Sequence, residues 1–306
     1  MKNIFLLLVT LCLTACKTEK KPADYVNPII GATTFDEFKG SYHGLGKTFP
    51  GVCTPFGLVQ LSPDTKTGGD NGSGYSWHHK TIEGFSFTHM SGVGWYGDLG
   101  NFLVMPTTGT LKTFKGTEEE PESGYRSRYS HEREQASAHK YTVMLDDYQI
   151  QAELAAAPRS GIIRFTYPKS DTSRIQIDLA RRIGGSSTEQ YVEVVDNHTI
   201  KGWMKCTPNT GGWGDGQGKA DYTVYFHCCF DKPLKNFGVW SADIPDEADR
   251  KNASNDNPAY FEYIKNARVL PMQKSAQGKH LGFYTEFPTE EGEQVLLKCG
   301  ISLVSM

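Results

Sequence analysis

The chain has little of three features that mark common function classes. Lys and Arg total 32 against 35 Asp and Glu in 306 residues, so no basic surface is offered to nucleic acid. The longest apolar run, residues 4–13, is too short to cross a membrane. Helical periodicity is scarce, and only residues 246–253 are predicted to form a short helix. The sequence therefore predicts no nucleic-acid partner and disfavours an α-helical fold.

Two familiar site motifs are also absent. None of the seven cysteines falls in a C-x-x-C arrangement, which disfavours a metal or redox site of that type. The Gly-rich stretch 207–220 lacks the G-K-[ST] of a phosphate-binding loop and is interpreted as a rim loop carrying Trp213. Five cysteines follow Cys16, and this odd number leaves at least one free thiol. We interpret most of the five as small buried hydrophobic residues, with Cys228 and Cys229 on opposite faces of one strand.

The first residues are typical of a targeting segment. Lys2 precedes the apolar run, and Leu13-Thr14-Ala15-Cys16 resembles a bacterial lipobox with cleavage before Cys16 and lipid on its sulfur. Residues 1–15 are then a lipoprotein signal peptide and residues 16–23 a tether. An ordinary signal peptide with a chance cysteine is the alternative. The expected location is the cell envelope, anchored to the membrane through lipid, on an outer-membrane or periplasm-facing surface.

Period-two alternation dominates the chain after Tyr141. It is clear in Tyr148–Leu154, Ile163–Tyr167 and Ile175–Leu179, where every second residue is apolar. Tyr222–Phe230 is apolar on both parities, which predicts a central strand covered on both faces, and residues 295–304 are the last strand candidate.

Many short strands separated by Gly, Pro, Asn and Asp predict an all-β fold, a large antiparallel β-sandwich. No boundary divides residues 24–306, so we expect one domain there. The last residues, 299–306, are apolar and strand-like, whereas domains usually finish in polar, exposed residues. We therefore expect the domain to be interrupted at this point.

The segment Gly74–Pro106 has the composition of a carbohydrate site. It holds two tryptophans, three histidines, two tyrosines and two acids between glycine-broken turns. Aromatic faces stack on the apolar C–H side of a sugar, while polar side chains bond its hydroxyls. A large β-protein with an aromatic core and ordinary turns would also produce such a segment.

Five residues of this segment are the candidates for sugar contact. They are Trp77, His78, His89, Trp95 and Asp98. For each, a structural role is the competing interpretation: core packing for the tryptophans, satisfied hydrogen bonds for the histidines, and turn capping for Asp98. The pair His131 and Glu132 could suggest a metal or acid–base site, but a structural role is favoured.

Several ordered motifs are similar to those of one enzyme family. They are Asp24–Gly31, Phe49–Gly57, Gln60–Asp64, Tyr129–Glu134, Ala152–Leu154 and Gly300–Ser302. Together they resemble the N-terminal part of a glycoside hydrolase family 92 α-mannosidase of the Bacteroides type. Many members read Ser-Gly-x-Gly-Cys where this chain has Ser91-Gly92-Val93-Gly94-Trp95, which leaves the linkage specificity open.

The resemblance implies an exo-acting, calcium-dependent, inverting enzyme. Its build is an N-terminal β-sandwich followed by an (α/α)6 barrel, and the general acid, the base and most calcium ligands lie in the barrel. No catalytic residue and no metal ligand of the family is therefore placed in this chain. Two carboxylate pairs within this chain could be considered for inverting hydrolysis: Asp98 with Glu132, and Asp64 with Asp70. Without the barrel, however, nothing would enclose the cleft or fix the attacking water, so catalysis by this chain alone is not expected.

Three functions follow from these observations. The first is the carbohydrate-binding N-terminal part of a calcium-dependent exo-α-mannosidase, truncated before its catalytic domain. The expected linkage is α-1,2 and the expected substrate is mannose of N-glycans or mannan. Such a chain is expected to associate with itself or with a separately made barrel chain. The second is a non-catalytic, lipid-anchored surface protein that binds glycans. The third is a truncated remnant without function.

Overall fold

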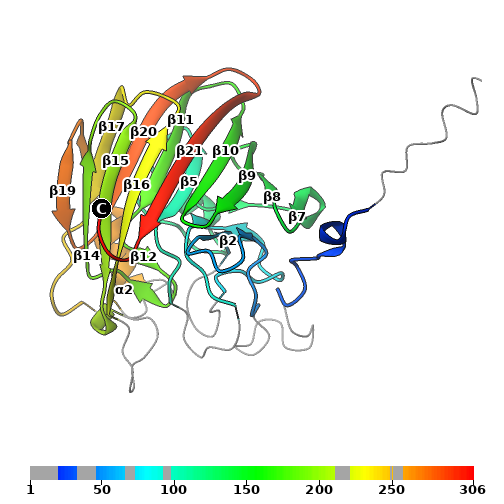
Figure 1. The fold of residues 1–306 in the computed structure, drawn as a ribbon. Coiled ribbons are helices and arrows are strands. Elements are labelled where there is room, and N and C mark those ends of the chain that lie inside the picture. Colours follow the sequence, from blue (N-terminus) through cyan, green and yellow to red (C-terminus); the bar gives the residue numbers. More distant parts are fainter. Residues whose placement is uncertain are drawn as a thin grey trace, which may run out of the picture.

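The computed structural model describes residues 20–32, 46–65, 73–91, 98–210, 221–248, 250 and 258–306. Two large antiparallel sheets lie face to face, and the chain passes repeatedly between them (Figure 1). The predicted all-β sandwich is confirmed. A single α-helix, α2 (Pro258–Lys265), is present in the described part of the chain.

One sheet has eight strands in the order β1-β2-β4-β5-β11-β20-β17-β18. These strands are β1 (Val52–Cys53), β2 (Gln60–Asp64), β4 (Gly84–Ser86), β5 (Leu103–Thr108), β11 (Ser170–Asp178), β17 (Asn236–Ser241), β18 (Arg268–Pro271) and β20 (Leu281–Thr289).

The other sheet has nine strands in the order β19-β14-β15-β16-β21-β10-β9-β8-β7. These strands are β7 (Glu134–Ala136), β8 (Tyr141–Leu145), β9 (Ile150–Ala157), β10 (Ser160–Tyr167), β14 (Glu189–Val194), β15 (Thr199–Cys206), β16 (Tyr222–Phe230), β19 (Ser275–Gly278) and β21 (Glu293–Ser302).

Short elements complete the fold. The strand pairs are β3 (Thr81–Ile82) with β6 (Ser127–Arg128), and β12 (Arg181–Arg182) with β13 (Gly185–Ser186). The 3₁₀ turns are η1 (Pro22–Tyr25), η4 (Pro121–Ser123), η5 (His131–Arg133) and η6 (Pro208–Thr210). Helix α2 packs Phe261 edge-on against Phe114, with 5.6 Å between the ring centroids.

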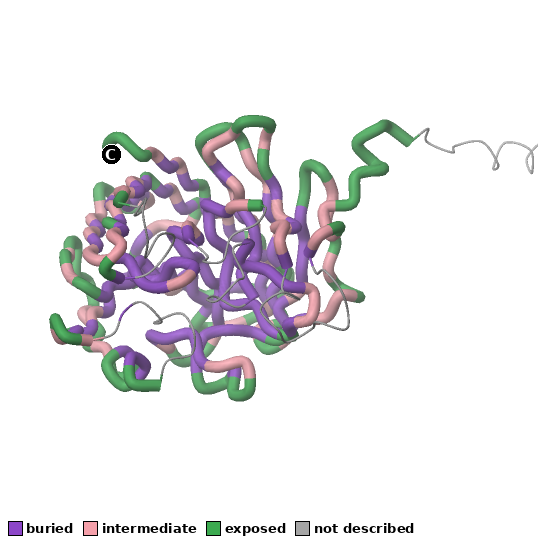
Figure 2. The backbone as a smooth tube through the Cα atoms, turned by 90° about the horizontal axis from the view of Figure 1, so that it is seen from below, coloured by how far each residue is buried: buried purple, intermediate pink, exposed green. Residues whose placement is uncertain are grey.

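The alternating sequence explains why these strands form one core. In β10, Ile163, Phe165 and Tyr167 are buried and point inward, while Arg164 and Thr166 between them are half-buried. Strands of both sheets do the same, so two apolar faces meet, and Figure 2 shows the buried backbone concentrated in the interior.

Aromatic rings join the two layers across this core. Phe85 of the eight-stranded sheet lies 6.3 Å from Phe165 of the other sheet, and Phe230 and Phe283 make a similar pair at 6.2 Å. Each buried phenylalanine stabilises the fold by about 1.5–3 kcal/mol relative to an exposed one. The packed core therefore makes the sandwich rigid enough to hold the loops that connect its strands in fixed positions.

Two details differ from the sequence expectations. Residues 246–248 form a turn instead of the start of a helix, residue 250 is not helical, and residues 249 and 251–257 lie outside the described part. Strand β16 matches the predicted Tyr222–Phe230, but only one of its faces is buried. Its other face carries Tyr225, His227 and Cys229. Because tyrosine and cysteine are largely apolar, the sequence pattern predicted that this face would also be buried.

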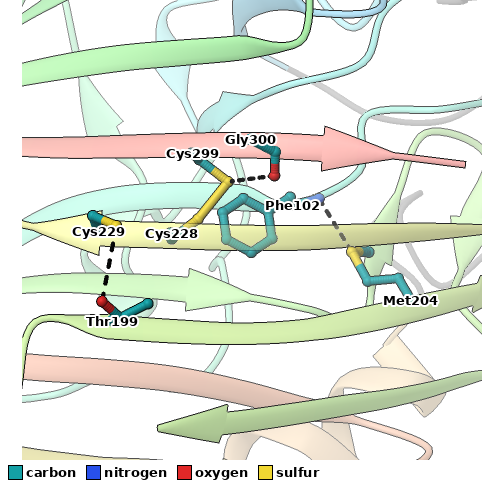
Figure 3. The surroundings of a disulfide bond; sticks show 7 residues. All are labelled: Phe102, Thr199, Met204, Cys228, Cys229, Cys299 and Gly300. Carbon is teal, nitrogen blue, oxygen red and sulfur yellow. Dashed lines mark hydrogen bonds between the residues drawn. A yellow bond between two sulfur atoms is a disulfide. The ribbon is translucent and has the colours of Figure 1, made fainter. Parts of the chain in front are cut away.

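Two cysteines that we expected to be simple buried hydrophobic residues form a disulfide. Cys228 of β16 and Cys299 of β21 occupy directly paired positions, with Cα atoms 4.2 Å apart (Figure 3). The disulfide links two residues that are 71 positions apart in the sequence. Cys229 points to the opposite face, as predicted, and is half-buried. Cys206 is buried and matches the expectation, whereas Cys53 is exposed.

Candidate functional site

The segment 74–106 contributes β4 and β5, two adjacent inner strands of the eight-stranded sheet. It supplies β3, β4 and most of β5, so its loops are anchored at several points. Residues 92–97, which include Trp95, lie outside the described part of the chain, as does Cys16. Of the five predicted sugar-contact residues, the structure therefore places Trp77, His78, His89 and Asp98.

Trp77 is half-buried, and one face of its ring is covered by His131. The two ring centroids are 3.6 Å apart and the planes differ by 2°. The Nε2 atom of His131 also lies 2.7 Å from the carbonyl oxygen of Trp77, so it donates to that oxygen. Stacking and hydrogen bond together fix both the backbone and the indole of Trp77. His78, next in the chain, is half-buried too.

His131 is itself held by a buried carboxylate. Its Nδ1 atom lies 2.6 Å from Oε2 of Glu134, which is almost fully buried. The hydroxyl of Tyr75 donates to Oε1 of Glu134 at 2.9 Å, and that of Tyr141 donates to the same oxygen at 2.6 Å. Burial, together with the nearby carboxylate, raises the pKa of both tyrosines far above its ordinary value, so they remain donors.

These contacts give the segment Tyr129–Glu134 a clear structural role. Ser130 caps the 3₁₀ turn η5 by accepting a hydrogen bond from the amide of Glu132, and the ring of Tyr129 meets His131 edge-on at 5.3 Å. The sequence analysis favoured a structural role for His131 and Glu132 but did not connect them with Trp77. Tyr75 and Glu134 were missed as supports, because only the fold brings residues 59 positions apart together.

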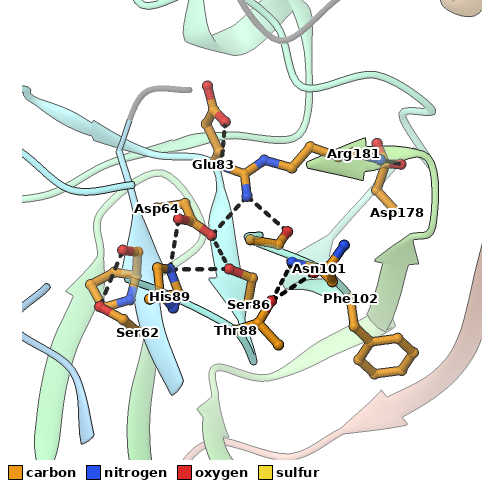
Figure 4. Close-up of polar contacts among 12 residues, drawn as sticks. Ser62, Asp64, Glu83, Ser86, Thr88, His89, Asn101, Phe102, Asp178 and Arg181 are labelled. Atoms are coloured by element: carbon orange, nitrogen blue, oxygen red, sulfur yellow. Dashed lines mark hydrogen bonds and ion pairs between the residues drawn. The ribbon is translucent and has the colours of Figure 1, made fainter. Parts of the chain in front are cut away.

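His89 is buried, and both of its ring nitrogens meet protein oxygens. Nδ1 lies 2.7 Å from the carbonyl oxygen of Gln60. Nε2 lies 2.9 Å from Oδ1 of Asp64 (Figure 4). Ser86 donates its hydroxyl to the other oxygen of Asp64. These bonds assign His89 to the support of the loop, and its contact with sugar remains a prediction.

A network of buried ions lies beneath the segment. Arg181 contacts Oδ2 of Asp64 at 3.0 Å and Oε2 of Glu83 at 3.4 Å (Figure 4). Lys115 contacts Oε1 of Glu83 at 2.8 Å. Arg126 also pairs with Glu83. Burial alone would raise the pKa of the Glu83 carboxyl, but the three cations outweigh it and lower the pKa to about 2.

Asp98 is also buried and held by protein groups. Its Oδ1 atom accepts from the hydroxyl of Tyr222 at 2.7 Å and from the amide of Leu99 at 2.7 Å, and it lies 3.3 Å from Nε of Arg182. The side chain thus ties the part of the segment that precedes β5 to β16 and to β12. Its role toward sugar likewise stays a prediction.

The described residues do not form a metal site. Among them, no group of three or more His, Cys, Asp or Glu side chains is placed to hold a metal ion. The carboxylates that calcium prefers are instead engaged by cations in the network around Arg181. In the same described ranges, no helix is long and apolar enough to span a membrane.

Comparison with known proteins now decides the family. The glycosyl hydrolase family 92 N-terminal domain matches residues 25–302. This chain belongs to glycoside hydrolase family 92. No curated protein matches it.

Solved family 92 structures share this fold. The α-mannosidase BT3965 from Bacteroides thetaiotaomicron is 36% identical, with a TM-score of 0.76 over 95% of this chain and 34% of its own. Its complex with mannoimidazole gives 36% identity and a TM-score of 0.75 over 94% and 33%. The inverting mannosidase BT2199 from Bacteroides thetaiotaomicron VPI-5482, at 22% identity and a TM-score of 0.67 over 94% and 32%, shows the fold alone. This chain thus spans about a third of the length of these relatives.

Proposed function

We propose that this chain is the mannose-binding, non-catalytic part of an exo-α-mannosidase that removes α-1,2-linked mannose from N-glycans or mannan. Its family membership supports a mannosidase, and a relative that is 36% identical has been solved with mannoimidazole, a mannose-like inhibitor. The family resemblance of the sequence motifs adds the inverting, exo-acting chemistry.

The observation that carries the proposal is the support of Trp77. An aromatic ring that binds sugar has to present its face in a fixed orientation, because ordering a mobile side chain on binding reduces affinity. His131 fixes the indole from one side, Glu134 fixes His131, and Trp77 remains partly exposed. A ring held in this way suits a wall of a sugar-binding cleft. Contact of the neighbouring His78 with sugar stays a prediction.

The buried carboxylates of Asp64, which precedes the segment, and of Asp98 within it are engaged by protein groups. Inversion requires an acid and a base roughly 6.5–9.5 Å apart with a water between them. Asp64 is held by Arg181 and His89, and Asp98 is held by Tyr222 and Arg182, so neither faces an open cleft. We therefore assign the acid, the base and the calcium ion to the part of such an enzyme that this chain does not span.

An assay for mannose release tests this assignment. Purified chain, calcium and α-1,2-mannobiose are incubated, and free mannose is measured over time. We expect no release above that of a sample without protein. Steady release that persists through a second purification would overturn the assignment of acid and base to another part of the enzyme.

The proposed location is the cell envelope, with lipid on Cys16. This anchor would place the sugar-binding surface outside the cytoplasm, where glycans of other organisms are met. A surface protein that binds glycans without cutting them is the second candidate function. It is favoured by Tyr191, Trp203 and Tyr225, half-buried aromatic residues in register across the outer face of the nine-stranded sheet.

A further inference from the structure

The outer face of the nine-stranded sheet carries aromatic residues that the core does not use. In β14, β15 and β16, every second side chain points into the sandwich, and Val192, Met204 and Phe226 are buried examples. The positions between them point away from the core and, apart from the buried Thr199, are half-buried or exposed. The sequence pattern of β16 predicted that this outer face would also be buried.

Three of these outward residues stand in one line across the sheet. Tyr191 of β14 pairs with Trp203 of β15, and Trp203 pairs with Tyr225 of β16. The rings of Tyr191 and Trp203 are 6.1 Å apart and within 20° of parallel. The same line continues into Gln277 of β19 on one side and Ser302 of β21 on the other. We call Tyr191, Trp203 and Tyr225 the aromatic row.

Polar residues border the aromatic row along both of its sides. One border consists of Glu193, Lys201 and His227, and the other of Glu189, Lys205 and Thr223, each set in register across the same three strands. With His227 neutral, each border carries one acid and one lysine, so the two sets add no net charge. They offer both hydrogen-bond donors and acceptors.

Neighbouring polar groups keep this surface ordered. The hydroxyl of Tyr191 donates to Oε2 of Glu193 at 2.9 Å, and Lys201 lies 3.7 Å from the same oxygen. At the other border, Gln277 donates to Oε1 of Glu189 at 2.8 Å. Gly300, in line with His227 on β21, has no atom within 3.8 Å of the position a Cβ would take, so the face is shallow there.

We propose that the aromatic row binds a neutral oligosaccharide chain. Sugar rings are apolar on one face and carry hydroxyls at their edges, which matches an apolar strip between two hydrogen-bonding borders. The absence of net charge fits a neutral ligand better than a nucleic acid or an acidic polymer. Three strands at about 4.8 Å spacing give a row about 10 Å long, enough for about two hexose units.

This site is separate from the one at Trp77 and does not depend on the mannosidase function. Trp77 lies in the segment beside the eight-stranded sheet, whereas the aromatic row lies on the outer face of the nine-stranded sheet. A surface of this kind would hold a glycan near the protein while another site acts on its end.

Affinity electrophoresis of the whole chain tests the proposal. The probes are yeast α-mannan, barley β-glucan and dextran, which are neutral, and polygalacturonate, which is acidic. We expect at least one neutral polymer to retard the chain, and Trp203→Ala or Tyr225→Ala to weaken that binding at least about tenfold, as loss of a central aromatic contact does. Tyr263→Ala, which removes an exposed tyrosine on α2, is the matched control and should change nothing.

Several outcomes would overturn the proposal. They are no retardation by any neutral polymer, retardation that Trp203→Ala leaves unchanged, retardation by polygalacturonate alone, and self-association in sedimentation equilibrium that Trp203→Ala abolishes. Melting temperatures verify that each variant is folded. Binding of methyl α-mannoside separates the two sites, because Trp203→Ala should leave it intact whether or not the proposed function at Trp77 is correct.

Discussion

At the scale of single residues, position matters more than residue type. The segment 74–106 is rich in groups that could bind sugar, yet the structure uses many of them internally: His89 on Asp64, and Asp98 on Tyr222. Trp77 is different because it packs between the ring of His131 and the hydrophobic core and yet remains only half-buried. This distinction depends on a contact between Trp77 and His131, which are 54 residues apart in the sequence.

Replacing His131 should weaken mannose binding without unfolding the chain. His131→Ala removes a stacked ring worth about 0.5–1.5 kcal/mol and a hydrogen bond worth about 1 kcal/mol. We expect the affinity for methyl α-mannoside to fall by about three- to tenfold, measured by titration calorimetry. Arg133→Ala in the same turn η5 is the control, because its exposed ion pair with Asp146 does not touch Trp77. Equal affinities for His131→Ala and wild type would show that Trp77 needs no such support.

His280 should make the fold sensitive to mild acid. Burial lowers its pKa to about 4 from an ordinary value near 6.5, and it lines a cavity of about 30 Å³ beside Tyr260. The unfolded chain then binds a proton that the folded chain excludes, so stability falls as the pH drops from about 6.5 to 4.

Within this window, wild type should lose up to about 1.4 kcal/mol per pH unit relative to His280→Gln, as followed by urea unfolding. His227→Gln, which changes an exposed histidine, is the control and should follow wild type. A parallel pH dependence for wild type and His280→Gln would contradict the assignment of His280 as the sensor.

At the scale of elements, local patterns identify strands but not their partners. The alternation in residues 163–167 and the run Tyr222–Phe230 locate β10 and β16 well, because period two is a local property. The order of the sheets is not local: β11 lies between β5 and β20, which come from distant parts of the chain. The prediction that both faces of β16 are covered is wrong, because aromatic residues occur on protein surfaces as well as in cores.

The disulfide between β16 and β21 should be a main source of stability at the centre of the nine-stranded sheet. The double variant Cys228→Ala/Cys299→Ala should lose about 2–4 kcal/mol of unfolding free energy, because the unfolded chain regains the freedom of a long loop. Alkylation followed by mass spectrometry provides the direct measurement: both residues should react only after reduction of unfolded protein. Alkylation of Cys228 and Cys299 without reduction would show that the bond is not formed.

At the scale of the whole molecule, the family resemblance predicted what local patterns could not. Ordered motifs such as Phe49–Gly57 and Tyr129–Glu134 pointed to family 92, and the match over residues 25–302 confirms it. The candidate site was only partly predictable. Its position near Trp77 follows from composition, but the support by Glu134 and the engaged state of Asp98 require the folded arrangement.

The proposed anchor makes a prediction about the molecule in its cell. Cys16→Ala should move the protein from the membrane fraction to the soluble fraction of the envelope, because the sulfur that carries lipid is lost. Cys53→Ala, which removes an exposed cysteine of the folded domain, should leave the distribution unchanged. Fractionation and immunoblotting give the result, and membrane association that persists in Cys16→Ala would show that lipid on this residue is not the anchor.

Binding of methyl α-mannoside by wild type and Trp77→Ala tests the central claim most directly. Half a cleft encloses little of its ligand, so we expect weak binding by wild type, measured by saturation-transfer NMR and titration. Trp77→Ala should abolish it, while Trp203→Ala should retain it. Mannoside binding that is unchanged in Trp77→Ala, or no binding by folded wild type at any concentration up to solubility, would contradict the account.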